Sequence, residues 1–132
     1  MNDYRVLLLT SKGEAGLNVT PPLGLYRLKF YLEERGIACD VLDLDLYPHQ
    51  TALEQVADGG YALVGMSVSH FQIDNDLEVL WQFRRAAEKA PRKVLFAAGG
   101  QEAALNDRQW LKAGVDLILL GFAEEVDRKS VV

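Results

Sequence analysis

Residues 61–68, with the sequence YALVGMSV, decide the fold of this chain. The stretch is almost continuously apolar, which is typical of a parallel strand buried on both faces of a sheet. Asp58-Gly59-Gly60 end a short helical segment before it, and Asp74 opens a longer helical segment after it. The sequence therefore predicts a central parallel strand that lies between two helices along the chain.

Apolar strands followed by segments with helical periodicity recur on both sides of this stretch along the chain. Further strands are predicted at residues 5–10, 37–44, 93–98 and 115–120. The first two helices are predicted at residues 20–35, where Gly36 ends the helix, and at residues 50–57. The third begins at Asp74 and ends before Pro91. The fourth is short, with Asn106 as its N-cap and Gly114 as the residue that ends it. Five strands with helical crossovers predict an α/β fold, a doubly wound five-stranded parallel sheet in three α/β/α layers with the flavodoxin-like order 2-1-3-4-5.

Length and composition bound the size of this fold. The 132 residues are 49% hydrophobic and 25% charged, as in an ordinary globular domain, so residues 1–132 are expected to form a single domain. Such a domain normally ends with a helix over the first strand, and the residues after 120 are too few and too polar to form one. We therefore expect an N-terminal fragment of a longer polypeptide. The apolar face beside the first strand predicts a homodimer of the isolated fragment.

The charge and the apolar runs exclude several classes of protein. A net charge of -5 without clusters of Lys or Arg argues against nucleic acid as a partner. The apolar runs, such as residues 117–120, are too short to span a membrane, and no polybasic membrane patch is present. The N-terminus lacks the basic flank and apolar core of a signal peptide, so a cytoplasmic location is expected.

Cysteine and tryptophan residues are interpreted as structural. Cys39 is the one cysteine, which excludes an internal disulfide, a CxxC zinc site and a self-contained iron-sulfur cluster. It is predicted to be a small buried hydrophobe in the second strand. Trp81 and Trp110 occur at helical spacing with other apolar residues and are predicted to lie in the core.

Candidate chemistry lies where the predicted strands end, because ligands of open α/β sheets bind at the carboxyl ends of the strands. The residues there are mainly hydroxyls and glycines: Thr10-Ser11, Ser67, Ser69 and His70, Gly99-Gly100-Gln101, and Gly121-Phe122. Glycine exposes bare backbone to a ligand, and hydroxyls bond to neutral groups. The edge therefore suits a bulky, largely neutral ligand.

Two familiar uses of this fold do not agree with these residues. A phospho-receiver needs an acidic pair after the first strand and an aspartate after the third, where this chain has Thr10-Ser11 and Ser69. A dinucleotide site needs GxGxxG in the first turn, and residues 11–16, SKGEAG, contain only GxxG. Asp43, at the end of the second strand, is a weak signal for ribose binding.

Two alternatives stay open from the residues alone. An FMN site uses a hydroxyl-rich phosphate loop after the first strand, and Thr10, Ser11 and Thr20 allow an FMN-binding redox domain of the flavodoxin type. A non-catalytic interaction domain with a degenerate site is the other alternative.

Several short segments resemble one family in order and spacing. They are VLLL at 6–9, PPLGL at 21–25, YLEERG at 31–36, VGMSVS at 64–69, Gly99-Gly100 followed by AAL at 103–105, GVD at 114–116, and Gly121. Together they resemble the cobalamin (vitamin B12)-binding domain at the N-terminus of cobalamin-dependent radical SAM enzymes. The resemblance covers nearly the whole chain.

The resemblance implies that cobalamin binds over the carboxyl ends of the strands, with its nucleotide tail in a crevice between sheet and helices. Ser67 and Ser69 would hydrogen-bond the tail, and Gly99 and Gly100 would let it pass close to the backbone. Pro22, Leu23 and Gly24 would lie under or beside the corrin, Ser11, Gln101, Gly121 and Phe122 would be neighbours, and His70 could approach the cobalt. No residue is assigned as a metal ligand.

Departures from the family pattern refine this expectation. The loop at 11–19 contains no histidine, so the resemblance implies base-off cobalamin without a histidine ligand from this loop. The family's GGPHAT stretch is GGQEAA at 99–104, and its GEGE stretch is GFAE at 121–124. The radical SAM partner domain needs a CxxxCxxC triplet, and Cys39 stands alone, so the [4Fe-4S] cluster and S-adenosylmethionine would belong to the rest of the polypeptide. The fragment itself would carry the cofactor without catalysing the reaction.

Overall fold

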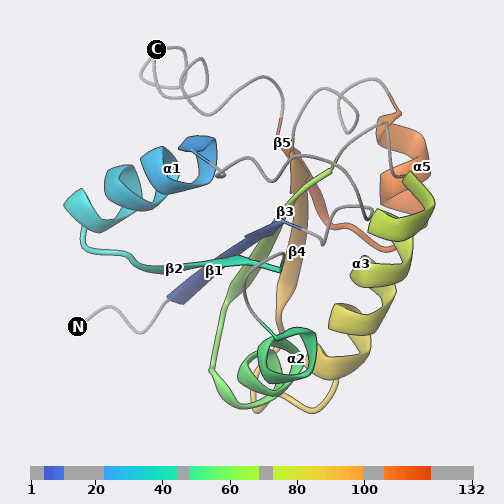
Figure 1. The fold of residues 1–132 in the computed structure, drawn as a ribbon, viewed down its shortest axis with the longest axis horizontal. Coiled ribbons are helices and arrows are strands. Elements are labelled where there is room, and N and C mark those ends of the chain that lie inside the picture. The colour runs from blue at the N-terminus through green and yellow to red at the C-terminus, as the bar shows by residue number, and fades with distance from the viewer. Residues whose placement is uncertain (1–4, 11–22, 45–47, 69–72, 100–105, 120–132) are drawn as a thin grey trace.

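A computed structural model describes residues 5–10, 23–44, 48–68, 73–99 and 106–119 (Figure 1). The elements are β1 (Arg5–Thr10), α1 (Leu23–Glu34), β2 (Ala38–Asp43), α2 (His49–Asp58), β3 (Leu63–Ser67), α3 (Ile73–Ala87), β4 (Leu95–Gly99), α5 (Asp107–Lys112) and β5 (Leu117–Leu119). The strands form one all-parallel sheet in the order β2-β1-β3-β4-β5. The predicted fold class and strand order are confirmed, and β3 is the central strand.

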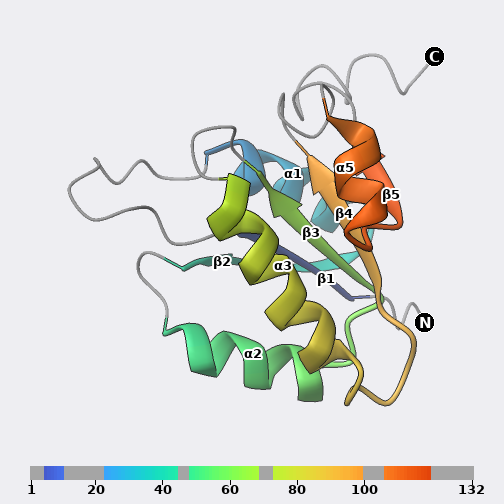
Figure 2. The same cartoon turned by 90° about the vertical axis from the view of Figure 1, so that its right-hand side faces the viewer.

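The helices form two outer layers. Figures 1 and 2 show α1 on one face of the sheet and α2, α3 and α5 on the other. Successive side chains of a strand point to opposite faces. Leu7 and Leu9 of β1 accordingly join the core beneath α2 and α3, whereas Val6 and Leu8 pack toward α1 with Cys39. We refer to these two surfaces of the sheet as the α2/α3 face and the α1 face.

The larger core lies on the α2/α3 face. Trp110, Tyr61 and Phe83 are its largest fully buried side chains, at 0%, 0% and 1% exposed. Trp110 comes from α5 and Phe83 from α3, so both helices are anchored to the sheet by an aromatic ring. The predictions that Trp110 and Cys39 are buried are confirmed.

The prediction that Trp81 lies in the core is wrong, because its side chain is 51% exposed. The buried positions of α3 are Val79, Leu80 and Phe83, together with Asp76. This rotation of the helix turns Trp81 outward, where the Arg85 guanidinium lies 5.1 Å from the centre of its ring. The contact is a cation–π interaction on the surface and leaves the core to its neighbours.

The element ends differ from the predicted ranges by a few residues. The predicted strand at 61–68 is β3 at Leu63–Ser67, because Tyr61 and Val68 are buried just outside the strand. The strand predicted at 93–98 is β4 at Leu95–Gly99, and the strand predicted at 115–120 shortens to β5 at Leu117–Leu119.

The helix ends follow the predicted glycines. Gly36 and Gly114 have φ angles of 79° and 113°, in the region that favours glycine after a helix. Asn106 is the N-cap residue of α5, although its side chain makes no capping hydrogen bond. No helix in the described ranges is long and apolar enough to cross a membrane.

Candidate functional site

The strand register brings one residue from each strand into a line at the carboxyl edge of the sheet. Thr10 pairs with Asp43 on one side and with Ser67 on the other. Ser67 pairs in turn with Gly99, and Gly99 with Leu119. We call these five residues the carboxyl-edge row. Residues far apart in the sequence are therefore neighbours at the edge where ligands of this fold class bind.

The carboxyl-edge row lies on the α1 face. Asp43 follows Cys39 and Val41 at two-residue steps, and both of these pack toward α1. Backbone hydrogen bonds continue past the strand ends, from the Leu44 N–H to the Thr10 carbonyl at 3.2 Å and from the Val68 N–H to the Gly99 carbonyl at 3.1 Å. These two hydrogen bonds extend the pairing between strands by one residue beyond Asp43 and Ser67.

Beside α1, the same face of β3 and β4 carries only small side chains near the carboxyl edge. They are Gly65 and Ser67 on β3, and Ala97 and Gly99 on β4, and we call them the small-residue strip. Among the described elements, α1 packs on β1 and β2 (Figure 1). Gly65 also has a packing role, because a Cβ there would lie 2.9 Å from Leu8 Cδ2.

The α1 face remains accessible farther from α1. Leu95 on β4 and Leu117 on β5 share this face with Ala97, and they are 38% and 46% exposed. An apolar surface of this kind is available for contact with a ligand or another part of the protein.

Thr10 and Asp43 form the polar pair of the row. The Thr10 hydroxyl donates to Oδ1 of Asp43 at 3.3 Å, and Asp43 is only 8% exposed. Buried carboxylates need such hydrogen bonds, because removal from water is costly without them. The pair joins β1 to β2 at the edge of the sheet.

The predicted site residues are only partly placed by the structure. Ser67 and Gly99 lie side by side in the carboxyl-edge row, and Leu23 and Gly24 open α1. The remaining predicted residues lie outside the described ranges: Ser11, Pro22, Ser69, His70, Gly100, Gln101, Gly121 and Phe122. Sequence reasoning missed Gly65 and Ala97, although each is two residues before a predicted site residue on the same strand and so shares its face.

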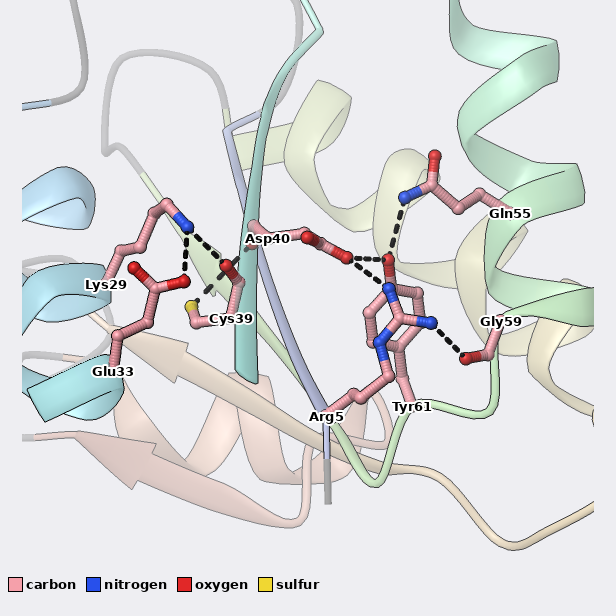
Figure 3. A network of polar contacts seen from close by, with 8 residues as sticks. All are labelled: Arg5, Lys29, Glu33, Cys39, Asp40, Gln55, Gly59 and Tyr61. Atoms are coloured by element: carbon pink, nitrogen blue, oxygen red, sulfur yellow. Dashed lines mark hydrogen bonds and ion pairs between the residues drawn. The ribbon is translucent and has the colours of Figure 1, made fainter. Parts of the chain in front are cut away.

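A polar network occupies the amino-terminal edge of the sheet (Figure 3). Tyr61 Oη donates to Asp40 Oδ2 at 2.6 Å and accepts from Gln55 Nε2 at 2.7 Å. Arg5 donates to the same Asp40 oxygen at 2.7 Å and to the Gly59 carbonyl at 3.0 Å. The network joins β1, β2 and α2 to the segment that leads into β3. It stabilises the edge opposite to the candidate site.

Two buried groups near this edge have shifted pKa values. Burial raises the pKa of Tyr61 to about 12, and the hydrogen bond that it donates to Asp40 adds to this effect. Burial raises the pKa of the Cys39 thiol to about 11, partly offset by Lys29. Lys29 donates to the Cys39 carbonyl at 2.7 Å and to Glu33 at 2.8 Å, and the bond to Glu33 raises the pKa of Lys29 (Figure 3). A thiol with a raised pKa is a poor nucleophile, so Cys39 is structural.

The fold and the row together define a class of protein: a parallel α/β domain that presents hydroxyl groups, a carboxylate and bare backbone at the carboxyl edge of its sheet. Residues 13–129 match the family described as B12 binding domain. The chain belongs to this family, and membership supports cobalamin as the ligand.

Solved structures agree with the fold. A novel cobalamin-binding protein from Desulfitobacterium hafniense DCB-2 superposes with a TM-score of 0.67 at 19% identity, over 97% of this chain. The chain spans 58% of the length of that protein. A response regulator receiver protein from Pseudomonas putida superposes with a TM-score of 0.54 at 18% identity, over 90% of this chain and 86% of its own. No curated protein matches the sequence.

The two structural neighbours share a fold and differ in printed function, so the fold alone does not distinguish their ligands. The residues at the strand ends do distinguish the two kinds of site. Thr10 and Ser67 end β1 and β3, whereas a receiver domain needs acidic residues after both strands. A phospho-receiver function therefore remains excluded, because these strand ends lack the acidic residues that it needs.

Proposed function

We propose that this chain binds cobalamin at the carboxyl edge of its sheet and serves as the cofactor module of a radical SAM enzyme. The observation that carries the proposal is the small-residue strip beside α1, in a chain that belongs to the B12 binding domain family. Ser67 and Gly99, which were selected from the sequence, are adjacent in that strip.

The residues of the strip fit a bulky organic ligand. Ser67 and Gly99 are the partly exposed members of the strip, and Gly99 has no side chain, so a flat group can approach the backbone at this end of the strip. Ser67 supplies a hydroxyl that can donate to or accept from a neutral polar group. In the bound state, Ser67 and Gly99 would hold the nucleotide tail, and Leu23 and Gly24 would support the corrin.

Bound cobalamin supplies organometallic cobalt chemistry, such as the transfer of a methyl group. The contribution of this chain would be to bind the cofactor and to orient it. The segment between residues 11 and 19 contains no histidine, so it would supply no histidine ligand to cobalt, and the base-off state is proposed from the resemblance alone. The chain would supply binding and orientation, and the reaction would take place against the neighbouring domain.

A titration with hydroxocobalamin tests the binding proposal. The purified chain is mixed with hydroxocobalamin and desalted, and the corrin absorbance that remains with the protein is measured. We expect stoichiometric retention with a base-off spectrum. Loss of all corrin absorbance on desalting would contradict the proposal.

A matched pair of variants locates the site. Ser67→Trp places an indole in the small-residue strip and should abolish retention, whereas Thr51→Trp places the same group on the exposed surface of α2, on the opposite face. Circular dichroism shows whether both variants fold. A folded Ser67→Trp variant that retains cobalamin as well as Thr51→Trp would argue against this location.

The radical SAM context is a second part of the proposal and needs its own test. It rests on the ordered segments that resemble the N-terminal domains of those enzymes, such as PPLGL at 21–25. The full-length polypeptide should contain a CxxxCxxC triplet and show iron-sulfur absorbance after anaerobic purification. A full-length sequence without this triplet would remove the radical SAM part and leave cobalamin binding unaffected.

A further inference from the structure

Basic side chains are concentrated on α3 and α5, which lie on the side of the sheet opposite to the small-residue strip (Figure 2). Residues 81–112 hold half of the 14 Lys and Arg residues of the chain but only three of its 19 Asp and Glu residues. Within the described ranges, the acidic residues of this region are Glu88 and Asp107. In the sequence the cations occur singly or in pairs, so the packing of α5 beside α3 is needed to bring those of the two helices to one surface.

One hydrogen bond joins the second half of α3 to the end of α5. The Arg84 guanidinium donates to the Ala113 carbonyl at 3.2 Å. On α5, Arg108 and Lys112 are exposed one turn apart, on the side opposite to the buried Trp110. Arg108 lies in the first turn of α5, where the helix dipole disfavours a cation, so helix stability does not explain its presence.

Trp81 adds an apolar side chain to this surface, one turn before Arg85 on α3. It is 51% exposed, and the Arg85 guanidinium lies 5.1 Å from the centre of its ring. We call the following residues the basic surface: Trp81, Arg84, Arg85, Arg108 and Lys112. In the described part of the chain, none of its four cations forms an ion pair. Tryptophan and arginine are among the residue types most enriched in the side chains that dominate binding at protein interfaces. The composition of the basic surface is therefore that of a contact surface for another molecule.

Charge decides the class of partner. Cations without ion-pair partners attract an anionic ligand, because the potentials of the two surfaces are complementary. A nucleic acid extends well beyond the basic surface and would meet the acidic remainder of the chain, whose net charge repels it. A short acidic segment of a protein presents its carboxylates locally, and an apolar side chain within the segment can pack on the ring of Trp81.

We propose that the basic surface binds an acidic segment of a partner protein, in which an apolar residue lies between the carboxylates. The basic surface lies across the sheet from the small-residue strip, so it is separate from the proposed cobalamin site. The inference is therefore independent of the proposed function.

Three fluorescent probes test this proposal by anisotropy: a short peptide that repeats Glu-Glu-Leu, the same peptide with Gln in place of Glu, and an oligothymidylate of equal length. Dissociation constants are measured for the wild-type chain, Trp81→Ala and Arg85→Gln. Matched controls come from α1, on the other face of the sheet. Phe30→Ala removes an aromatic ring that is 64% exposed, and Arg35→Gln removes a guanidinium that lies 3.4 Å from the centre of the Tyr31 ring. Circular dichroism shows whether each variant folds.

We expect the wild-type chain to bind the acidic peptide more tightly than the neutral peptide, and added salt to weaken this binding because it screens the charges. Trp81→Ala and Arg85→Gln should each raise the dissociation constant about fivefold or more, whereas the two α1 variants should leave it unchanged. The double variant Arg108→Gln/Lys112→Gln, which removes charge from α5 alone, should also weaken binding and provides the test if a variant of α3 does not fold.

Three results would overturn the proposal. They are a wild-type chain that does not prefer the acidic peptide to the neutral one, an equal loss of affinity in the α1 and the α3 variants, and tighter binding of the oligothymidylate than of the acidic peptide. The last result would assign the basic surface to a nucleic acid.

Discussion

Removal of the Tyr61 hydroxyl should destabilise the protein without affecting its candidate site. Tyr61→Phe keeps the buried ring and deletes two hydrogen bonds, one donated to the Asp40 carboxylate at 2.6 Å and one accepted from Gln55 at 2.7 Å. A hydrogen bond to a charged group contributes about 1.5–3 kcal/mol and a neutral one about 0.5–1.5 kcal/mol. Asp40 keeps its ion pair with Arg5 and its side chain is 39% exposed, so water and arginine compensate part of the loss.

The lower end of the range then applies, and the free energy of unfolding should fall by about 2 kcal/mol. With an m-value of about 2 kcal/mol/M, the urea midpoint should fall by about 1 M. Tyr31→Phe is the control, since the Arg35 guanidinium lies over the Tyr31 ring rather than its hydroxyl, 3.4 Å from the ring centre. The network lies at the amino-terminal edge, so affinity for hydroxocobalamin should not change. Equal urea midpoints for Tyr61→Phe, Tyr31→Phe and the wild type would refute the reasoning.

Two further predictions concern alkaline pH and a helix end. The folded-state pKa of Cys39 is raised by burial from 9.0 to about 11, so its contribution to stability is fully present below pH 9 and is lost as the pH rises through 11. The free energy of unfolding should therefore fall by about 2 kcal/mol more in the wild type than in Cys39→Ala between these values, as measured by urea titrations; parallel pH curves would contradict this. Gly114→Ala should cost about 2 kcal/mol, because a φ of 113° is strained for alanine and the new Cβ would displace the Arg84 guanidinium, which donates to the Ala113 carbonyl at 3.2 Å. Gly36→Ala, with nothing within 4 Å of its Cβ, should cost about 1 kcal/mol, and an equal shift in melting temperature for both variants would show that the Arg84 contact is unimportant.

Much of the fold was predictable because the signals are local. The apolar run at 61–68 and the alternation of strands and helices depend on neighbouring residues, and short-range periodicity reveals them. The burial of Cys39 and Trp110 follows from the same patterns, whereas the exposure of Trp81 does not. The same spacing places Trp81 near the apolar stripe of α3, and only the packing of α3 against the sheet decides that Val79 and Phe83 point inward.

The candidate site was predictable as a location. Parallel strands place their carboxyl ends along one edge, so Ser67 and Gly99 could be selected before their pairing was known. The small side chains of Gly65 and Ala97 were present in the sequence, but their shared face becomes evident only when β3 and β4 are in register.

The amino-acid sequence by itself determined the order of elements, the central place of the third strand, and the set of hydroxyls and glycines at the strand ends. The tertiary structure alone decided which of these residues meet. Thr10 lies beside Asp43 because parallel pairing joins segments more than thirty residues apart. The same assembly brings Arg5 and Tyr61 together at Asp40. Periodicity reports which side of an element is buried, whereas the partners of a parallel strand are separated from it by a crossover and are therefore fixed only when the sheet assembles.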